Sequence, residues 1–413
     1  MNNINLPDDV LIYTLAFLSV PDILIFRQVC KRFNALTRLH IVWTNAFKHD
    51  ILFNDYPAPI DDTDLEQRTC HACRLASRWL ADSPLMPSSE TSFTGSPIWE
   101  IKFIPGRQHK WLLTVSKGIW SVLTIWDIAH GFKCSEWSLR GALFTGVKLN
   151  TDTESEASMA VALDGSQRIV LLHLDDGGKL REIHCFDSDL HPVTLTGDII
   201  ALSDHISTTL IYNWKTDERA YLDEGGDMQY DHCIQIIFTA QTILIICACS
   251  INLYTTPPFL HGQTHSPTAS HSFGWIDSAS ATPTSILIRS ESDNPWIPDV
   301  DSFELYSLSS FPPILTSKIS SRRGVLRCTG VILGKCGTAV WICPYREMTF
   351  PDEEHHETLM AAVFPGPLNP TAQPRVREVF SNPLNNWTTL DYDEELGRIA
   401  LGSGLGKITV VQL

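Results

Sequence analysis

Residues 98–139 contain four short runs in which apolar and polar side chains alternate, and these runs decide the fold. They read IWEIKF (98–103), KWLLTV (110–115), SVLTIWD (121–127) and KCSEWSL (133–139). A period of two predicts β-strands, because successive side chains of a strand point to opposite faces. Turn residues separate the runs, so we expect four strands that belong to one small unit.

Similar units follow along the rest of the chain, roughly every 40–50 residues, which is the period of a four-stranded propeller blade. The last unit, WTTLDY (387–392), RIALGS (398–403) and KITVV (407–411), is nearly as regular as the first. Counting gives seven units, at 97–140, 141–189, 190–227, 228–273, 274–322, 323–382 and 383–413. Six or eight units stay open because the fifth and sixth are the least regular. An array of two-sheet β-sandwiches is the alternative architecture.

The first unit ends its third run on Trp126-Asp127, and this pair resembles the Trp-Asp signature of WD repeats. The resemblance covers most of residues 97–413 and implies an all-β propeller, which we expect to be seven-bladed with four-stranded blades.

The last unit has three runs rather than four. An open ring would leave an unpaired strand edge, which favours aggregation. The candidate for the missing strand before the first blade is about Ser88 to Thr94. We therefore predict that this segment pairs with residues 405–413.

The composition restricts the class of protein. The chain has 413 residues, of which 44% are apolar and 19% charged, so there is enough apolar material for two to four packed domains at roughly 100–200 residues each. The net charge of −16 repels phosphate backbones and anionic lipid, and the densest basic cluster is only Arg322-Arg323 with Arg327. We expect neither nucleic acid nor a membrane as a partner.

The eleven cysteines are scattered, which is typical of reduced, buried thiols rather than a disulfide framework. The apolar run Val10–Val20 is preceded by Asp8-Asp9 rather than by Lys or Arg, and no small-residue cleavage site follows it, so it does not read as a signal peptide. No run reaches the 18–20 apolar residues, roughly, that a membrane span needs. We expect an intracellular protein of the cytoplasm, the nucleus or both.

The first sixty residues differ from the rest because their apolar residues follow a helical period. Pro7 fits a first helical turn, and Asp8 and Asp9 lie where the helix dipole favours negative charge. Apolar stripes at helical spacing then predict four short helices before residue 50. Such a unit has a thin core and exposes apolar surface, so we expect a binding partner here.

Residues 4–47, INLPDDVLIYTLAFLSVPDILIFRQVCKRFNALTRLHIVWTNAF, resemble an F-box. The resemblance rests on Leu6-Pro7, the apolar pairs Val10-Leu11 and Phe17-Leu18, Asp22-Ile23-Leu24, Val29-Cys30-Lys31-Arg32-Phe33 and Trp43. Asp9 departs from the commoner Glu but keeps the charge. The resemblance implies binding to the Skp-family adaptor and, through it, to the cullin of a cullin-RING ubiquitin ligase.

The same resemblance places the adaptor contacts on ten residues of this sequence: Leu6, Pro7, Val10, Leu11, Leu15, Leu18, Val29, Cys30, Phe33 and Trp43. Apolar anchors of such an interface are partly exposed in the free protein. We therefore expect Leu6, Pro7, Val29, Cys30 and Trp43 to be partly exposed.

Residues 61–83 read as one more helix, with Leu65, Ala72, Ala76 and Trp79 on one face. Cys70 and Cys73 within it are expected to be small core residues, because no second pair of ligands stands nearby. The predicted domains are an F-box domain at 1–60, a linker helix at 61–83 and a propeller at 84–413.

Residues 352–357, DEEHHE, are dense in possible metal ligands, but neighbouring residues of one loop rarely converge on a single ion. No HExxH, GxSxG or P-loop motif occurs with suitable surroundings. We therefore expect no metal, no cofactor and no catalytic group in this chain.

Together the two halves predict a non-catalytic substrate receptor of an SCF-type ubiquitin ligase, with the adaptor bound at the F-box and a substrate protein bound at the propeller. One alternative is a propeller scaffold whose F-box serves only its own turnover. Another is a hydrolase with a metal at His355 and His356.

Overall fold

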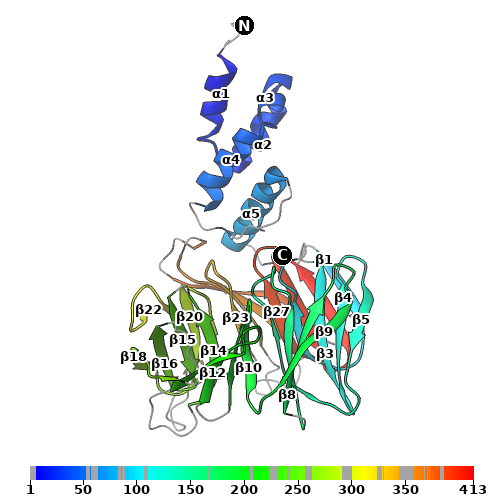
Figure 1. Cartoon of the computed structure of the whole chain (residues 1–413). Helices are drawn as coiled ribbons and strands as arrows, with labels where there is room; N and C mark the ends of the chain where they lie inside the picture. The colour runs from blue at the N-terminus through cyan, green and yellow to red at the C-terminus, as the bar shows by residue number, and fades with distance from the viewer. Residues whose placement is uncertain are drawn as a thin grey trace, which may run out of the picture.

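The computed structural model describes most of residues 6–413. The described part leaves out residues 53–55, 57–63, 82–84, 86–88, 107–109, 166, 205–207, 224–230, 240, 256–262, 291–299, 323–327, 329, 344–356, 367, 370, 372 and 382–385. Figure 1 shows a column of short helices standing on one face of a ring of β-sheets. The helix nearest the ring is α5, and the C-terminus lies beside it.

The helical part is built from short segments with clear start signals. They are α1 (Asp8–Leu15), α2 (Val20–Val29), α3 (Lys31–Leu36), α4 (His40–Ala46), the π-helix η1 (Phe47–Leu52) and α5 (Leu65–Leu80). The Ser19 side chain accepts the Asp22 N–H at the start of α2, and Pro21 sits in its first turn. The Asp64 side chain caps α5 in the same way by accepting the Glu66 N–H. None of the helices in the described residues is long and apolar enough to cross a membrane.

These helices share one buried cluster, to which α5 contributes. Leu15, Ile23, Leu36 and Val42 are buried together with Cys70 of α5. Arg27 of α2 donates two hydrogen bonds to the Glu66 carboxylate at the start of α5, at 2.5 and 3.0 Å. This hydrogen-bonded ion pair and the shared core fix α5 to the preceding helices.

The remaining chain forms seven separate sheets, each with four antiparallel strands, which are the blades of a propeller. Blade 1 is β2 (Ile98–Phe103), β3 (Trp111–Lys117), β4 (Ser121–Asp127) and β5 (Phe132–Trp137); blade 2 is β6 (Phe144–Leu149), β7 (Met159–Leu163), β8 (Arg168–Leu174) and β9 (Leu180–Asp187). Blade 3 is β10 (His191–Thr196), β11 (Ile199–Ser203), β12 (Thr208–Asn213) and β13 (Glu218–Asp223); blade 4 is β14 (Cys233–Phe238), β15 (Thr242–Cys247), β16 (Ser250–Thr255) and β18 (Ala269–Ser272). Blade 5 is β19 (Ile276–Ala281), β20 (Ser285–Ser290), β21 (Val300–Ser307) and β22 (Ile314–Arg322); blade 6 is β23 (Val331–Leu333), β24 (Thr338–Cys343), β25 (Thr358–Val363) and β26 (Arg375–Ser381). Blade 7 is β27 (Trp387–Asp393), β28 (Arg398–Ser403), β29 (Lys407–Gln412) and β1 (Ser89–Thr94).

Apart from β1 and one two-residue strand, the strands of each sheet fall inside one of the seven predicted units. The blade count is therefore confirmed, and the counts of six and eight and the sandwich array are wrong. A repeated detail supports the common unit: in six blades the pairing of the first two strands shifts register after the first or second residue of the first strand. In blade 1 the shift lies between Ile98 and Glu100, and in blade 7 between Trp387 and Thr389. A β-bulge there turns the intervening side chain out of the regular pleat.

The ring closes as the sequence predicted. Strand β1 pairs antiparallel with β29, from Ser89 opposite Gln412 to Thr94 opposite Lys407. Phe93 of β1 is buried against Trp126 of blade 1, with 5.8 Å between the ring centroids. Gly406, at φ +84°, has no room for a side chain because an added Cβ would stand 2.0 Å from the Gly95 carbonyl oxygen. The segment before the first blade therefore covers the edge that the last three strands leave open.

One short strand was missed. Strand β17 (Thr264–His265) pairs in parallel with β13 and adds a fifth strand to the sheet of blade 3. Its two residues carry no period that a sequence could show, because the pattern needs a run of several residues.

The helices occupy one face of the propeller, and we call the opposite face the free face. Helix α5 contacts the turn between β27 and β28, where the His71 Nε2 donates to the Glu395 carbonyl oxygen at 3.2 Å. It also contacts the start of β26, where Arg375 donates to the Leu80 carbonyl oxygen at 2.8 Å. Because strands alternate in direction, the first strand of each blade begins and its second strand ends on the free face.

Candidate partner-binding surfaces

A candidate surface lies on the exposed side of α1 to α3 and of the segment before α1. Of the predicted adaptor contacts, Leu6, Pro7, Val10, Val29 and Cys30 are exposed, and Val29 keeps 64% of its surface accessible. Large apolar side chains that remain in water after folding indicate a surface that another protein covers. The expectation of partial exposure holds for Leu6, Pro7, Val29 and Cys30, and Val10 is exposed as well.

Arg32 brings the two exposed segments together. Its guanidinium donates to the Asp8 carboxylate at 2.6 and 2.8 Å and also to the Leu6 carbonyl oxygen. This holds the segment with Leu6 and Pro7 against the start of α3, which directly follows Val29 and Cys30. The exposed residues therefore form one neighbourhood, although more than twenty positions separate them in the sequence.

Two predicted contact residues lie inside the helical core instead. Leu15 is 3% exposed and Trp43 is 2% exposed. The Trp43 indole N–H donates to the Thr37 carbonyl oxygen at 2.9 Å, and the Arg27 guanidinium lies 5.5 Å from the ring centroid. The expectation that Trp43 is partly exposed is wrong, because its ring fills the space between the helices and its polar atom is satisfied there.

Leu11, Leu18 and Phe33 are half-buried and pack against this core, so each presents only an edge to the surface. The Phe33 ring contacts Phe26, with 5.0 Å between centroids. These three residues stabilise the helices that display the exposed ones.

An exposed aromatic pair at the C-terminal end of α1 was not among the predicted contact residues. Tyr13 and Phe17 are exposed, and their rings meet edge to face at a centroid distance of 5.1 Å. Both follow Val10 at helical spacing, so the stripe Val10, Tyr13, Phe17 could have been read from the sequence as a second face of α1. It extends the exposed apolar surface.

The helical part and the propeller are joined by a packed interface that α5 forms. Leu75 and Trp79 of α5 are buried in one cluster with Leu359 of β25, Tyr392 of β27 and Leu413. The Trp79 and Tyr392 rings meet edge to face at 6.4 Å. The shared cluster holds the two parts in one relative position.

Two features of this interface depend on close approach and on charge. Gly397, at φ +64°, lies under Leu75, and an added Cβ would stand 2.6 Å from the Leu75 Cδ1 atom. Burial lowers the pKa of His71, and its hydrogen bond to the Glu395 carbonyl oxygen partly offsets this effect. Burial therefore favours the neutral form of His71 at this contact.

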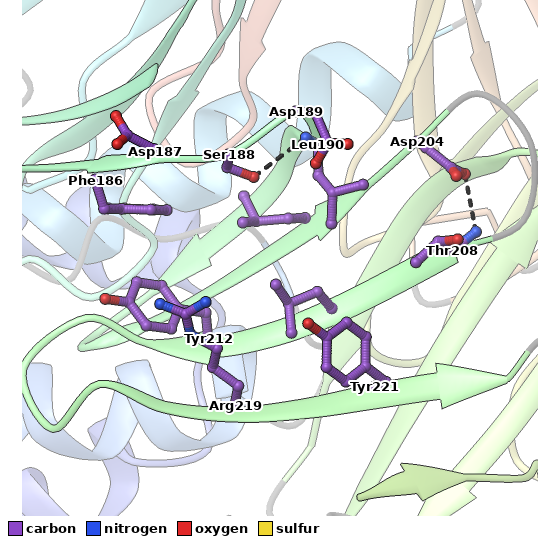
Figure 2. A pocket seen from close by; sticks show the side chains of 12 residues that line it. Phe186, Asp187, Ser188, Asp189, Leu190, Asp204, Thr208, Tyr212, Arg219 and Tyr221 are labelled. Atoms are coloured by element: carbon purple, nitrogen blue, oxygen red, sulfur yellow. Dashed lines mark hydrogen bonds between the residues drawn. The ribbon is translucent and has the colours of Figure 1, made fainter. Parts of the chain in front are cut away.

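A cavity of about 250 Å³ opens between blades 2 and 3 (Figure 2). Its walls combine aromatic and aliphatic side chains with charged and polar ones, among them Phe186, Tyr212, Asp187, Asp189 and Arg219. Figure 2 shows the Arg219 side chain across the Tyr212 ring, at 5.1 Å from its centroid.

The polar side chains of this cavity hold local structure. The Ser188 hydroxyl accepts the Leu190 N–H at 3.1 Å, and the Asp204 carboxylate accepts the Thr208 N–H at 2.8 Å. No histidine or cysteine is among the described residues that line the cavity, so Ser188 has no neighbouring base of the kind that activates a nucleophile.

The predicted metal-like loop cannot be placed, because residues 352–356 lie outside the described residues. Within the described part of the chain, no group of three His, Cys, Asp or Glu side chains could hold a metal ion. Cys70 and Cys73, the other candidate ligands, pack in the helical core as predicted.

The comparisons with known proteins agree with this architecture. A family model for the F-box domain matches residues 4–45. No curated protein matches the sequence. A chain of the crystal structure titled "Crystal Structure of Mitotic Checkpoint Complex" superposes with a TM-score of 0.54 at 6% identity, over 81% of this chain and 94% of that chain. At this identity the likeness shows the propeller fold alone.

Proposed function

We propose that this chain, in which an F-box domain is joined to a seven-bladed propeller, is the substrate-receptor subunit of an SCF-type cullin-RING ubiquitin ligase. The F-box family match and the propeller together fit a substrate receptor, an architecture typical of non-catalytic subunits. One observation carries the proposal. The exposed apolar surface of the F-box and the free face of the propeller lie at opposite ends of one packed unit (Figure 1).

At the first end, the Skp-family adaptor would cover the exposed residues, and cullin would be bound through the adaptor. Leu6, Pro7, Val10, Val29 and Cys30 are the proposed contacts, because they are accessible and gathered by Arg32. Buried apolar anchors at protein interfaces often contribute about 2 kcal/mol or more each. Leu15 and Trp43 would act by supporting the helices from within.

At the second end, the propeller would hold a substrate protein near the ubiquitin-charged enzyme. The chain itself would supply proximity, which converts a slow bimolecular transfer into an effectively intramolecular one. Because α5 is packed against both parts, the distance between adaptor and substrate would be set by the fold rather than by a flexible linker.

The test is affinity purification of the full chain from cells in which cullin activity is inhibited, with a chain lacking residues 84–413 as the comparison. We expect the full chain to capture proteins that the chain lacking residues 84–413 does not capture. These proteins should carry ubiquitin when the ligase is active. If the captured proteins are never ubiquitinated, the chain is a propeller scaffold whose F-box serves its own turnover.

A further inference from the structure

The free face of the propeller carries large apolar side chains that the fold does not need. Trp99, the residue at the bulge of β2, is 63% exposed, and Ile119 at the tip of the β3–β4 turn is 88% exposed. Trp120 and Leu143 are also exposed. We call Trp99, Ile119, Trp120 and Leu143 the blade-1 patch.

Contacts show that the patch is continuous. The Lys117 ammonium, at the end of β3, lies 3.9 Å from the centroid of the Trp99 ring, so Trp99 rests beside the β3–β4 turn. On the other side of this turn, the Ser121 N–H donates to the Ala142 carbonyl oxygen at 2.9 Å. The connection from blade 1 to blade 2, with Leu143, therefore adjoins Trp120.

A neighbouring turn extends the same surface. Leu405 is exposed at the β28–β29 turn of blade 7. The next residue, Gly406, accepts the Gly95 N–H at 2.7 Å, close to where the chain enters β2. Apolar tips from two adjacent blades therefore face the same side of the propeller, which is typical of an interaction surface.

The charges beside the patch select the chemistry of its partner. Lys117 and the exposed Arg140, in the connection that precedes Leu143, form no ion pair with any described carboxylate. Glu100 is paired with Lys102 at 3.0 Å, and Asp164 lies on the Leu143 side, where its N–H donates to the Leu143 carbonyl oxygen. The Trp99 end of the patch thus offers apolar surface beside a free cation, in a chain whose net charge is −16.

We propose that the blade-1 patch docks an acidic segment of the substrate protein in which a large apolar side chain stands next to an aspartate or glutamate. The apolar side chain would cover Trp99 and Ile119, and the neighbouring carboxylate would pair with Lys117 at the edge of the Trp99 ring. The identity of the occupant as a substrate rests on the proposed function, whereas the binding itself needs only the propeller.

The experiment selects ligands from a phage-displayed library of short random peptides on the immobilised full chain. We expect enrichment of peptides that combine aromatic or large aliphatic residues with Asp or Glu. Trp99→Ser/Ile119→Ser should weaken their binding about tenfold or more, since truncated interface anchors commonly have this effect. Trp275→Ser is the matched control, because Trp275 is 56% exposed in the connection just before β19 of blade 5, away from the patch, and it should leave binding unchanged.

A charge variant tests the chemistry separately. Lys117→Met keeps the aliphatic stem on Trp99 but removes the cation, so it should reduce the preference for acidic over neutral peptides while apolar binding persists. Equal binding of the selected peptides to wild type and to Trp99→Ser/Ile119→Ser would overturn the inference. A change from oligomer to monomer in that variant would also overturn it and assign the patch to a second copy.

Co-elution with purified Skp-family adaptor, measured on the same variants, separates the two proposals. Patch variants should keep wild-type adaptor binding. If the adaptor never binds but the peptides select the patch, the proposed ligase function fails and the docking site stands.

Discussion

Replacing Trp79 by alanine should loosen α5 from the propeller while leaving both parts folded. Trp79 is 1% exposed and lies in the cluster shared with blades 6 and 7. A buried tryptophan removes roughly 200 Å² from water, which at about 25 cal/mol per Å² gives about 5 kcal/mol. Alanine retains a small part of this, and large-to-small core substitutions cost about 3–5 kcal/mol. We therefore expect a loss of about 4 kcal/mol in docking free energy.

Amide hydrogen exchange measures this loss directly. A change of about 4 kcal/mol should speed exchange that proceeds by undocking by nearly a thousandfold, at 1.4 kcal/mol per factor of ten. The faster exchange should be confined to α5 and to the adjoining strands of blades 6 and 7. Arg78→Ala, on the exposed side of the same turn, is the control and should change stability by less than about 0.5 kcal/mol.

Exchange rates of α5 in Trp79→Ala that stay within about threefold of wild type would refute this reasoning. Such a result would mean that the packed interface does not hold the helical part in place. The fixed distance between adaptor and substrate would then have no structural basis.

Three further predictions concern ring closure, pH and the metal-like loop. Phe93→Ala should lower the propeller's free energy of unfolding, measured by urea denaturation, by about 3–5 kcal/mol. Truncation from Lys407 onward should give insoluble protein, and a soluble, stable truncated protein would contradict the closure of the ring by β1. Because burial lowers the pKa of His71, the unfolded chain binds a proton at this residue at higher pH than the folded chain does. The contribution of neutral His71 to the free energy of unfolding should therefore be fully present above pH 6.5 and be lost as the pH falls below that value. His71→Gln should flatten this part of the stability–pH profile, and an unchanged profile would exclude His71 as the cause. Replacing His355 and His356 by alanine should change stability by less than about 0.5 kcal/mol and release no metal, as judged by thermal melts and elemental analysis.

The repeated pattern of the sequence was enough to predict the blades. Period-two runs and turn residues indicated where each group of strands lies. Because the last unit shows only three strands, the sequence also predicted that the segment containing Phe93 supplies its fourth strand. These features are local or follow from the need to close an edge, so they can be read along one chain.

Burial within the helical part could not be predicted in the same way. A helical stripe shows which residues share a face but not whether core or partner covers that face. Trp43 and Val29 both carry the resemblance to the family, yet one is buried and the other exposed. Whether a residue is buried depends on how α2, α4 and α5 pack together, and the spacing of apolar residues along the sequence does not show this packing.

The docking of α5 on the propeller also could not be predicted from the sequence. The apolar face with Ala72 and Trp79 predicted a helix, and the partner of that face proved to be strands nearly three hundred residues away. The exposure of Trp99 depends on the bulge between Ile98 and Glu100. A strict period of two, extended back from the buried Phe103 and Ile101, would place Trp99 on the buried face as well.

Adaptor binding by the F-box surface is the central claim, and co-purification of adaptor and cullin with Leu6→Ala/Pro7→Ala tests it most directly. The matched control is Ile314→Ala/Leu315→Ala, which removes two adjacent exposed apolar side chains from the propeller. The account predicts that wild type and control bring down adaptor and cullin, and that Leu6→Ala/Pro7→Ala loses them, at roughly thirtyfold per residue, while it keeps its propeller-bound partners. Wild-type protein that brings down no adaptor under conditions where other F-box proteins do would contradict the account.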